Sequence, residues 1–356
     1  MRDTARPRGA SRPGPSRPGQ GPGFHDPGRF WPPYGKNHPG SWKRHTGGGA
    51  GRPGWLLRRH RLAPYLLLLP SIAAIALVLI WPAIQLGVFS AQDYGIRQET
   101  GTAATTWVGL HNFSAILADP EFWLSLRNTT AFAAVVVALT LVAGTLVGLL
   151  LNRLGPKMAA FVSGAALLAW ATPAVTATVI FYWLFDADGG VADWLLSRLP
   201  HWLAGSGWAG FSWVNSALPA YTVLTLIVVW QGFPFIAVTV LAGLKTVPAE
   251  LLESARVDGA GPWRLFWRVT FPLLRPIFLL LSLLSVIWDF GVFTQTYLLV
   301  GGNRDEFNLS VYAWYKAFQF PPFIGLGSAL ALVLTVILLI VTIGWVRANV
   351  REGATA

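Results

Sequence analysis

The chain has 356 residues, of which 53% are hydrophobic and 12% are charged, and its apolar residues come in long blocks rather than at the spacing of a soluble amphipathic helix. This composition excludes an ordinary water-soluble domain and predicts an integral membrane protein. Cysteine is absent, which excludes disulfides and cysteine-ligated metals, and the net charge of +11 is concentrated at one end, so it does not indicate nucleic-acid binding.

Residues 1–61 are predicted to form a disordered, basic cytoplasmic tail. Thirteen of the 27 Lys and Arg residues precede Leu62, in a stretch rich in Gly and Pro that cannot bury enough apolar surface to offset its chain entropy. About 60 mostly polar residues before the first apolar run are the wrong order for a secretory signal peptide. We therefore expect the first apolar run to remain in the mature protein.

Six later stretches are each long and apolar enough to cross a bilayer, which takes roughly 20 apolar residues in a helix. They cover approximately residues 63–90, 129–151, 158–185, 218–244, 276–300 and 323–346. The sequence thus predicts an all-α membrane domain over 62–348 with six transmembrane helices, followed by a short cytoplasmic tail at 349–356.

The positive charges predict the orientation of these spans. If the N-terminus is cytoplasmic, 22 Lys and Arg residues fall inside and five fall in external loops. The positive-inside rule then places both termini in the cytoplasm of a cell-membrane protein. The loop from Asp186 to Ala217 mixes Trp, Gly, Pro and Ser, and it is expected to form either a small external cap or a re-entrant turn.

Residues 246–276 form a charged island between the fourth and fifth spans. Pro248 suits the first turn of a helix, Asp258-Gly259 breaks that helix, and Gly261-Pro262 starts another. The second helix carries aromatic residues at positions 263, 266 and 267 on one face, and Pro272 and Pro276 are expected to end it. Its apolar stripe predicts contact either with a partner protein or with the membrane surface.

The island also carries a family motif. The segment Glu253-Ser254-Ala255-Arg256-Val257-Asp258-Gly259-Ala260, followed by Phe266, Val269, Pro272 and Pro276, resembles the cytoplasmic signature loop of ATP-binding-cassette (ABC) importer permeases. That loop reads Glu-Ala-Ala, Asp-Gly-Ala three residues on, and a later Leu-Pro; here Ser254 replaces the second Ala and Phe271 replaces the Leu. The resemblance implies a coupling helix that seats in a separate ATPase subunit through Glu253, Ala255, Asp258, Gly259 and Pro272.

The resemblance extends from about Pro64 to the C-terminus and is similar to the carbohydrate branch, the maltose and glycerol-phosphate permeases. It is supported by the stretches 108–113, 119–123, 230–235 and 296–303. It implies the type I importer fold, a sister permease subunit in a heterodimer, ABC ATPase subunits that use ATP, and an extracellular solute-binding protein. Membrane lipid is the remaining partner, and no nucleic acid is expected.

Asp289 is the one charged residue within the six predicted spans. A carboxylate is costly in the bilayer, so it should face the interior of the bundle, a water-filled cavity or a partner group. Ser285, Asp289 and Val292 share one helix face, and Trp230, Gln231 and Gly232 on the preceding span supply a ring, an amide and a gap. Rings beside hydrogen-bonding groups suit a sugar, although aromatic residues here could equally serve helix packing.

The resemblance implies a substrate pathway made of seven residues: Trp170, Ala174, Trp230, Gly232, Ser285, Asp289 and Val292. Asp289 stands where the family often has an amide, so it could accept hydrogen bonds from sugar hydroxyls or attract a cationic or amino sugar. The expected solute is a mono- or oligosaccharide or a derivative. A polyamine or another small solute is the alternative.

The sequence contains none of the common nucleotide-binding or catalytic motifs. There is no Gly-x-x-x-x-Gly-Lys-Ser/Thr loop for nucleotide phosphates, no Gly-x-Ser-x-Gly elbow and no His-Glu-x-x-His pair, and the six histidines are scattered. We expect a transport subunit that is not an enzyme, with no catalytic residues, no metal and no cofactor of its own. An ion-coupled secondary transporter, the other alternative, would be expected to show more intramembrane titratable groups.

Overall fold

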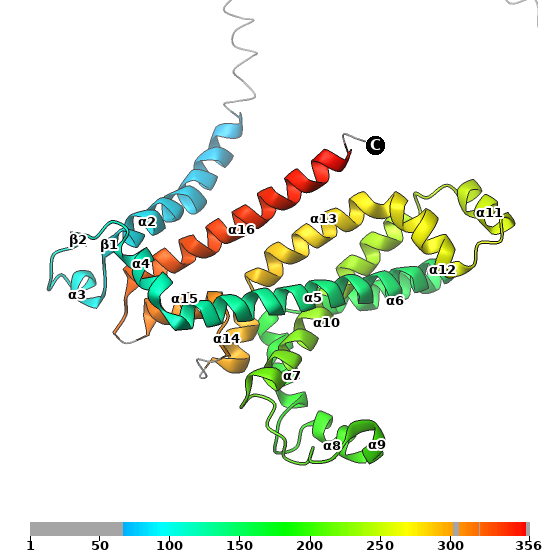
Figure 1. Ribbon diagram of the computed structural model, residues 1–356, viewed down its shortest axis with the longest axis horizontal. Coiled ribbons are helices and arrows are strands. Elements are labelled where there is room, and N and C mark those ends of the chain that lie inside the picture. Colours follow the sequence, from blue (N-terminus) through cyan, green and yellow to red (C-terminus); the bar gives the residue numbers. More distant parts are fainter. Residues whose placement is uncertain (1–66, 302–305, 320, 354–356) are drawn as a thin grey trace, which may run out of the picture. The chain divides into compact units, whose positions relative to one another are not determined.

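The computed structural model describes residues 67–301, 306–319 and 321–353. The chain divides into two units, Met1–Leu67 and Leu68–Ala356. The predicted basic tail, 1–61, lies outside the described residues, so the fold is that of the second unit, which is nearly all helical (Figure 1). Within the described part, its strands are β1 (Gln92–Asp93) and β2 (Thr106–Trp107), which pair antiparallel with Gln92 opposite Trp107.

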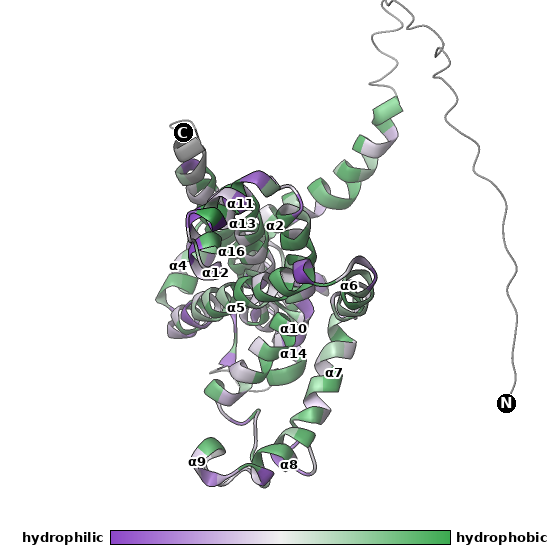
Figure 2. Cartoon of the chain, turned by 90° about the vertical axis from the view of Figure 1, so that its right-hand side faces the viewer, coloured by the Kyte–Doolittle hydropathy of each residue, from purple (hydrophilic) through white to green (hydrophobic). Residues whose placement is uncertain are grey.

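Five unbroken helices are long and apolar enough to span a membrane, and a sixth span is possible as a bent pair, within the residues described. The unbroken ones are Leu67–Ser90, Pro120–Arg153, Ala217–Leu244, Pro262–Phe290 and Ile324–Ala348; the bent pair is Pro156–Ala171 with Ala174–Leu184. Hydrophobic residues dominate these helices in Figure 2. The predicted all-α membrane fold is confirmed.

The first span contains a π-helical stretch, Ala76–Ile80, before α2 (Trp81–Ser90). The connection that follows contains β1, α3 (Ile96–Glu99), β2 and α4 (His111–Ala118). Asn112 holds this connection in place, because its side-chain amide donates to the carbonyls of Ser90 and Gln92, both at 2.9 Å. The long C-terminal helix α16 (Ile324–Gly353) packs on α2 and also on α15 (Leu309–Phe318), and it continues through residue 353 into the predicted tail.

The centre of the unit is the contact between α5 (Pro120–Arg153) and α10 (Ala217–Leu244). Glycines permit this close approach: a Cβ on Gly144 would lie 2.5 Å from Cβ of Ile236, and one on Gly148 would lie 2.9 Å from the carbonyl oxygen of Ala237. Gly232 on α10 faces Thr140 in the same way, at 3.0 Å. The Gly-x-x-x-Gly pair at 144 and 148 therefore serves helix packing.

The predicted third span, 158–185, is not one straight helix. It consists of α6 (Pro156–Ala171) and α7 (Ala174–Leu184), bent by 94°. Pro173 has no backbone N–H to continue the ladder, and the residue before a proline is driven out of the helical region. Thr172 accordingly has φ −67° and ψ 127°, which is extended backbone.

The predicted stop at Pro272 and Pro276 is also wrong. A single helix runs over Pro262–Phe290, made of α12 (Pro262–Leu265), a π-helical stretch at Phe266–Thr270 and α13 (Phe271–Phe290). The wider π turn lies directly before Pro272, where a proline ring would otherwise clash with the preceding turn. The helix ends instead at Phe290, and α14 (Thr294–Val300) follows after a short break, so the predicted span 276–300 is two helices.

The loop after α7 is a folded cap, which we call the α8–α9 cap, residues 186–216. It contains α8 (Val191–Arg198) and α9 (His201–Ala204). Asp193 is 5% exposed and accepts a hydrogen bond from the Trp213 indole N–H at 2.6 Å and another from the backbone N–H of Phe211 at 2.9 Å. Trp208 stacks on Trp213 with ring centroids 5.5 Å apart. These contacts favour the cap over the re-entrant turn.

Candidate functional site

A cavity of about 340 Å³ lies among α5, α6, α10 and α13, at the break before α14. Such a volume is typical of small-molecule sites, which range over about 300–1,000 Å³. Five of the seven predicted pathway residues line it: Trp170, Gly232, Ser285, Asp289 and Val292. The structure thus brings together residues from three helices that are far apart in the chain.

Ala174 and Trp230 do not line this cavity. Ala174 is the first residue of α7, beyond the bend at Pro173. Trp230 packs instead against Phe181 of α7, with ring centroids 5.6 Å apart. Val228 lines the cavity one helical turn before Gly232, so the spacing of α10 itself would have identified Val228 rather than Trp230.

Asp289 is the chemical centre of the cavity. It lies in the last turn of α13 and is 7% exposed, and it has no hydrogen-bond or ion-pair partner among the residues that the structure describes. Ser285, one turn earlier, is 4% exposed and shares its face, as the spacing predicts. Carboxylates held in this way without a partner are costly, which makes Asp289 a candidate functional residue.

Two side-chain amides at the edge of the cavity connect the bend at Pro173 with the break between α13 and α14. Gln231 donates from Nε2 to the carbonyl oxygen of Thr172 at 2.9 Å, which is the carbonyl exposed by the bend at Pro173. Gln295, in the first turn of α14, donates to Oε1 of Gln231 at 3.1 Å. Gln231 therefore links the bend of the third span to the break in the fifth.

Aromatic rings form one wall. Trp170 stacks on Phe235 with centroids 5.8 Å apart, and Trp288 meets the same ring edge-on at 5.6 Å. The wall itself is made of Trp170 from α6 and Trp288 from α13, which both pack on Phe235 of α10, a residue that does not line the cavity. A ring wall beside a carboxylate and amides can contact both the apolar C–H face and the polar rim of a sugar.

Thr140 of α5 is a lining residue that sequence reasoning missed. Its hydroxyl is buried and has no hydrogen-bond partner within the described ranges. A signal was present, because Thr140, Gly144 and Gly148 are spaced four residues apart and share the face of α5 that packs on α10.

The charged island of residues 246–276, which we call the coupling island after its predicted role, is built from α11 (Ala249–Val257) and α12, joined by a glycine turn as predicted. Gly259 has φ +77°, and its N–H donates to the carbonyl oxygen of Arg256 at 3.0 Å. The N–H of Ala260 donates to the carbonyl oxygen of Ala255, also at 3.0 Å. This pair of bonds is the Schellman helix end, which needs a residue at positive φ. The turn is therefore fixed by its own backbone.

The predicted coupling residues differ in exposure. Glu253, Asp258 and Gly259 are exposed, and Ala255 is partly buried. Pro272 is also exposed, but it lies more than two turns further on, within the continuous helix. Trp263 is 76% exposed on the second helix. Behind the island, a cavity of about 420 Å³ lies between it and the ends of α5 and α10.

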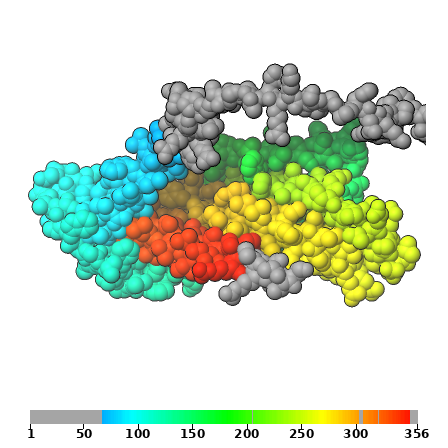
Figure 3. All heavy atoms as spheres, turned by 90° about the horizontal axis from the view of Figure 1, so that it is seen from above, coloured from blue at the N-terminus to red at the C-terminus, as the bar shows by residue number. Residues whose placement is uncertain are grey.

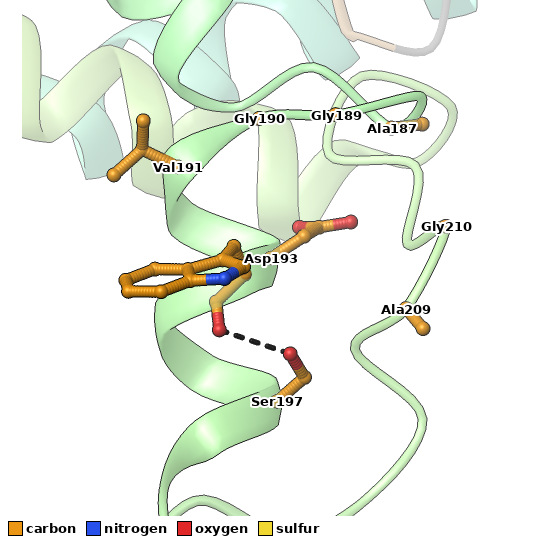
Figure 4. Close-up of a pocket in the computed structure, with 9 residues that line it drawn as sticks. Ala187, Gly189, Gly190, Val191, Asp193, Ser197, Ala209 and Gly210 are labelled. Carbon is orange, nitrogen blue, oxygen red and sulfur yellow. Dashed lines mark hydrogen bonds between the residues drawn. The ribbon is translucent and has the colours of Figure 1, made fainter.

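A third cavity, of about 490 Å³, lies in the α8–α9 cap and contains none of the predicted site residues. Figure 4 shows Asp193 extending from α8 towards the loop that carries Gly210, where both its carboxylate oxygens are already engaged. The Ser197 hydroxyl donates to the carbonyl of Trp194 at 2.9 Å (Figure 4). The polar groups of this cavity thus satisfy the cap itself.

A charged cluster joins the start of α5 to α15. Lys316 lies 3.0 Å from Asp119, and the Tyr312 hydroxyl donates to the same carboxylate at 2.5 Å. Partial burial raises the pKa of Asp119, but the hydrogen bonds from Tyr312 and Lys316 outweigh it and hold this pKa below its ordinary value. Across the described ranges, no group of three or more His, Cys, Asp or Glu side chains could hold a metal ion.

The family of binding-protein-dependent transport system inner membrane components matches residues 141–353. The match includes α10, the coupling island and the helix that carries Asp289.

Curated relatives match over most of the chain. The diacetylchitobiose uptake system permease protein DasB of Streptomyces coelicolor is 39% identical over 90% of this chain and 96% of its own length. The sulfoquinovosyl glycerol transport system permease protein SmoG of Agrobacterium fabrum is 32% identical over 82% of this chain and 92% of its own length. The trehalose/maltose transport system permease protein MalF of Thermococcus litoralis is 28% identical over 80% of this chain and 92% of its own length.

Among solved structures, a chain of a bacterial ABC transporter involved in the import of the acidic polysaccharide alginate matches with a TM-score of 0.70. It is 20% identical and covers 83% of this chain and 98% of its own. At this identity the match shows a shared fold.

Proposed function

The chain belongs to the family of binding-protein-dependent transport system inner membrane components, and from this premise we propose that it is the permease subunit of an ABC importer that carries a saccharide across the cell membrane. The observation that carries the proposal is the interior cavity in which Asp289, two amides and a wall of rings converge. The names of the relatives, which are uptake or transport permeases for saccharides and a sugar derivative, support the same solute class.

The proposed assembly contains this chain, a sister permease, two ABC ATPase subunits and an extracellular solute-binding protein. ATP is then used by the ATPase subunits and not by this chain, which needs no cofactor of its own. Both termini and the coupling island lie in the cytoplasm in this arrangement, in agreement with the distribution of Lys and Arg. The α8–α9 cap then lies on the external side.

The proposed contact with the ATPase is the exposed turn of the coupling island. Glu253, Asp258 and Gly259 are accessible there, and Ala255 supports the turn through its carbonyl. Trp263 presents an apolar ring beside them. Pro272 is better placed to shape the helix than to contact the ATPase, because it lies within the helix that leads to Asp289.

Reconstitution tests the function. The four-subunit complex in proteoliposomes should take up a labelled disaccharide only when ATP is present on the ATPase side and the binding protein on the other. Collapse of ion gradients with ionophores serves as the control and should leave uptake unchanged. Uptake that persists without ATP, or that stops with the ionophores alone, would reject an ABC importer in favour of ion coupling.

A further inference from the structure

We propose that the Asp289 cavity selects its saccharide by charge, favouring neutral or amino-bearing sugars and rejecting acidic ones. The inference rests on the proposed sugar-import function and adds the class of sugar. Membership of the family leaves this point open, because the relatives include a diacetylchitobiose permease and a sulfoquinovosyl glycerol permease, and sulfoquinovosyl groups carry a sulfonate. The lining residues of this chain decide it.

The first step is the unbalanced charge of the cavity. Asp289 is buried to more than nine-tenths and lines the cavity, and no described residue gives it a hydrogen bond or an ion pair. Among the described residues that line the cavity, none is Lys, Arg or His. No positive side chain among the described residues is therefore in place to compensate the carboxylate or to receive an acidic sugar.

The second step is the local backbone. Asp289 lies one residue before the end of α13 at Phe290, where the last carbonyl groups of the helix point out of its C-terminal end. A helix C-terminus carries a partial negative charge, which favours a cation or hydrogen-bond donors nearby and disfavours an anion. The end of α13 and the carboxylate thus act in the same direction, while the N-terminus of the seven-residue α14, which lines the same break, opposes them with a partial positive charge that is smaller than the full charge of Asp289.

The third step is the set of polar groups open to a ligand. Both carboxylate oxygens of Asp289 accept hydrogen bonds and donate none when ionised. Thr140 also lines the cavity, but its hydroxyl oxygen is buried, without a partner in the described part of the chain, so it is not counted among the groups open to a ligand. Gln231 already uses an amide N–H on Thr172 and its oxygen on Gln295, so it does not balance the excess of acceptors. A ligand with many donors, through hydroxyl, amide N–H or ammonium groups, fits this set.

The size of the selection follows from electrostatics. Two like charges about 5 Å apart at an effective dielectric constant of about 20 disfavour binding by roughly two orders of magnitude. A hydrogen bond between a charged and a neutral group contributes about tenfold or more in affinity. The preference for a neutral or amino sugar over its acidic counterpart should therefore be large enough to measure directly.

The experiment uses three matched disaccharides that differ at one position: the neutral sugar, its 2-amino-2-deoxy form and its uronic acid form. Binding to the complete permease–ATPase complex in detergent is measured by calorimetry without the binding protein, so that the selectivity of the binding protein does not enter. The variant is Asp289→Asn, which keeps the shape and removes the charge. The matched control is Asp188→Asn, the same change at an exposed acid in the α8–α9 cap.

The unmodified complex should bind the neutral and amino sugars on the order of a hundredfold more tightly than the uronic acid. Asp289→Asn should narrow the gap between amino and uronic forms by tenfold or more, whereas Asp188→Asn should leave it unchanged. Equal binding of the uronic acid by the unmodified complex would overturn the charge selection while sugar import stands. An unchanged difference in affinity between the amino and uronic forms in Asp289→Asn would also overturn the charge selection. If the unmodified complex neither binds nor transports any of the three sugars, the sugar-import function itself fails.

Discussion

Two regions of the molecule are held together by different forces: the first is the contact of α5 with α10, and the second is the coupling island. In the first, glycines at 144 and 148 bring two helices so close that an added Cβ would overlap side chains or backbone of α10. In the second, a turn exposed to solvent is fixed by its own backbone bonds, and an added Cβ at Gly259 meets nothing within 4 Å. Changes in the first region should therefore damage folding, and changes in the second should damage function alone. Figure 1 shows how far the island lies from the middle of α5.

The largest expected effect tests the packed region. Gly148→Leu should lower the free energy of unfolding by about 3 kcal/mol or more, because even its Cβ would lie 2.9 Å from the backbone oxygen of Ala237. Thermal unfolding of the purified complex measures the loss. Gly164→Leu on α6 is the control, since nothing lies within 4 Å of a Cβ there. Equal stability of the two variants would contradict the close packing of α5 on α10.

The next effect tests the island. Gly259→Pro should abolish stimulation of the ATPase by the loaded binding protein, because proline fixes φ near −65° where the turn has +77°, and it removes the N–H that bonds to Arg256. The thermal midpoint of the complex should change little, since this turn supports no core. Gly261→Ala, at φ −67° with open space around it, should keep full stimulation. Normal stimulation in Gly259→Pro would remove the coupling role from this loop.

A smaller effect is expected where the two helix breaks meet. Gln295→Leu removes the donor to Gln231, and the lost interaction of about 1 kcal/mol should reduce uptake severalfold with assembly intact. A double-mutant cycle with Gln231→Leu isolates the pair. If the two changes add without any coupling energy, the amides do not act together in transport.

The smallest effect concerns pH. The pKa of Asp119 is depressed in the folded state, so its contribution to stability is present above the unfolded pKa, near 3.9, and is lost as the pH falls through the lower folded value. Because the side chain is partly exposed, the loss should be below about 1 kcal/mol. Asp119→Asn keeps a residue able to cap α5 and should flatten this part of the acid unfolding curve. A curve identical to that of the unmodified chain would contradict the assignment.

The island could be predicted from sequence because its signals are local. Asp258-Gly259 and Gly261-Pro262 determine a helix end and a helix start by backbone geometry alone, and both are found where predicted. Pro173 was an equally local signal, but the uniform hydrophobicity of residues 158–185 concealed the bend. The opposite happened at Pro272 and Pro276, where a π-helical stretch lets the helix continue through both prolines.

The cavity was predicted only in part, because it depends on how separate helices meet. Asp289 and Ser285 follow from helical spacing and from the cost of a charge in the bilayer. Thr140 lines the cavity because α5 packs on α10, and Trp230 does not line it because its ring packs against Phe181 of α7, beyond the bend. Spacing within α5 and α10 places Thr140 and Val228 on the faces that line the cavity, but which face of each helix meets the cavity depends on how the separate helices pack. The roles of the lining and coupling residues in transport stay predictions.

The unbroken helix Pro262–Phe290 has a mechanical consequence. It carries the exposed Trp263 near one end and Asp289 near the other, and it lies beside α16 for part of its length (Figure 3). At about 1.5 Å per residue the 20 residues of α13 make a lever arm of about 30 Å, so a tilt of about 5° shifts the far end by about 3 Å. A displacement of that size breaks or makes a hydrogen bond. We therefore expect a small push on the tryptophan end to reach the carboxylate along one continuous helix, without any relay of side chains.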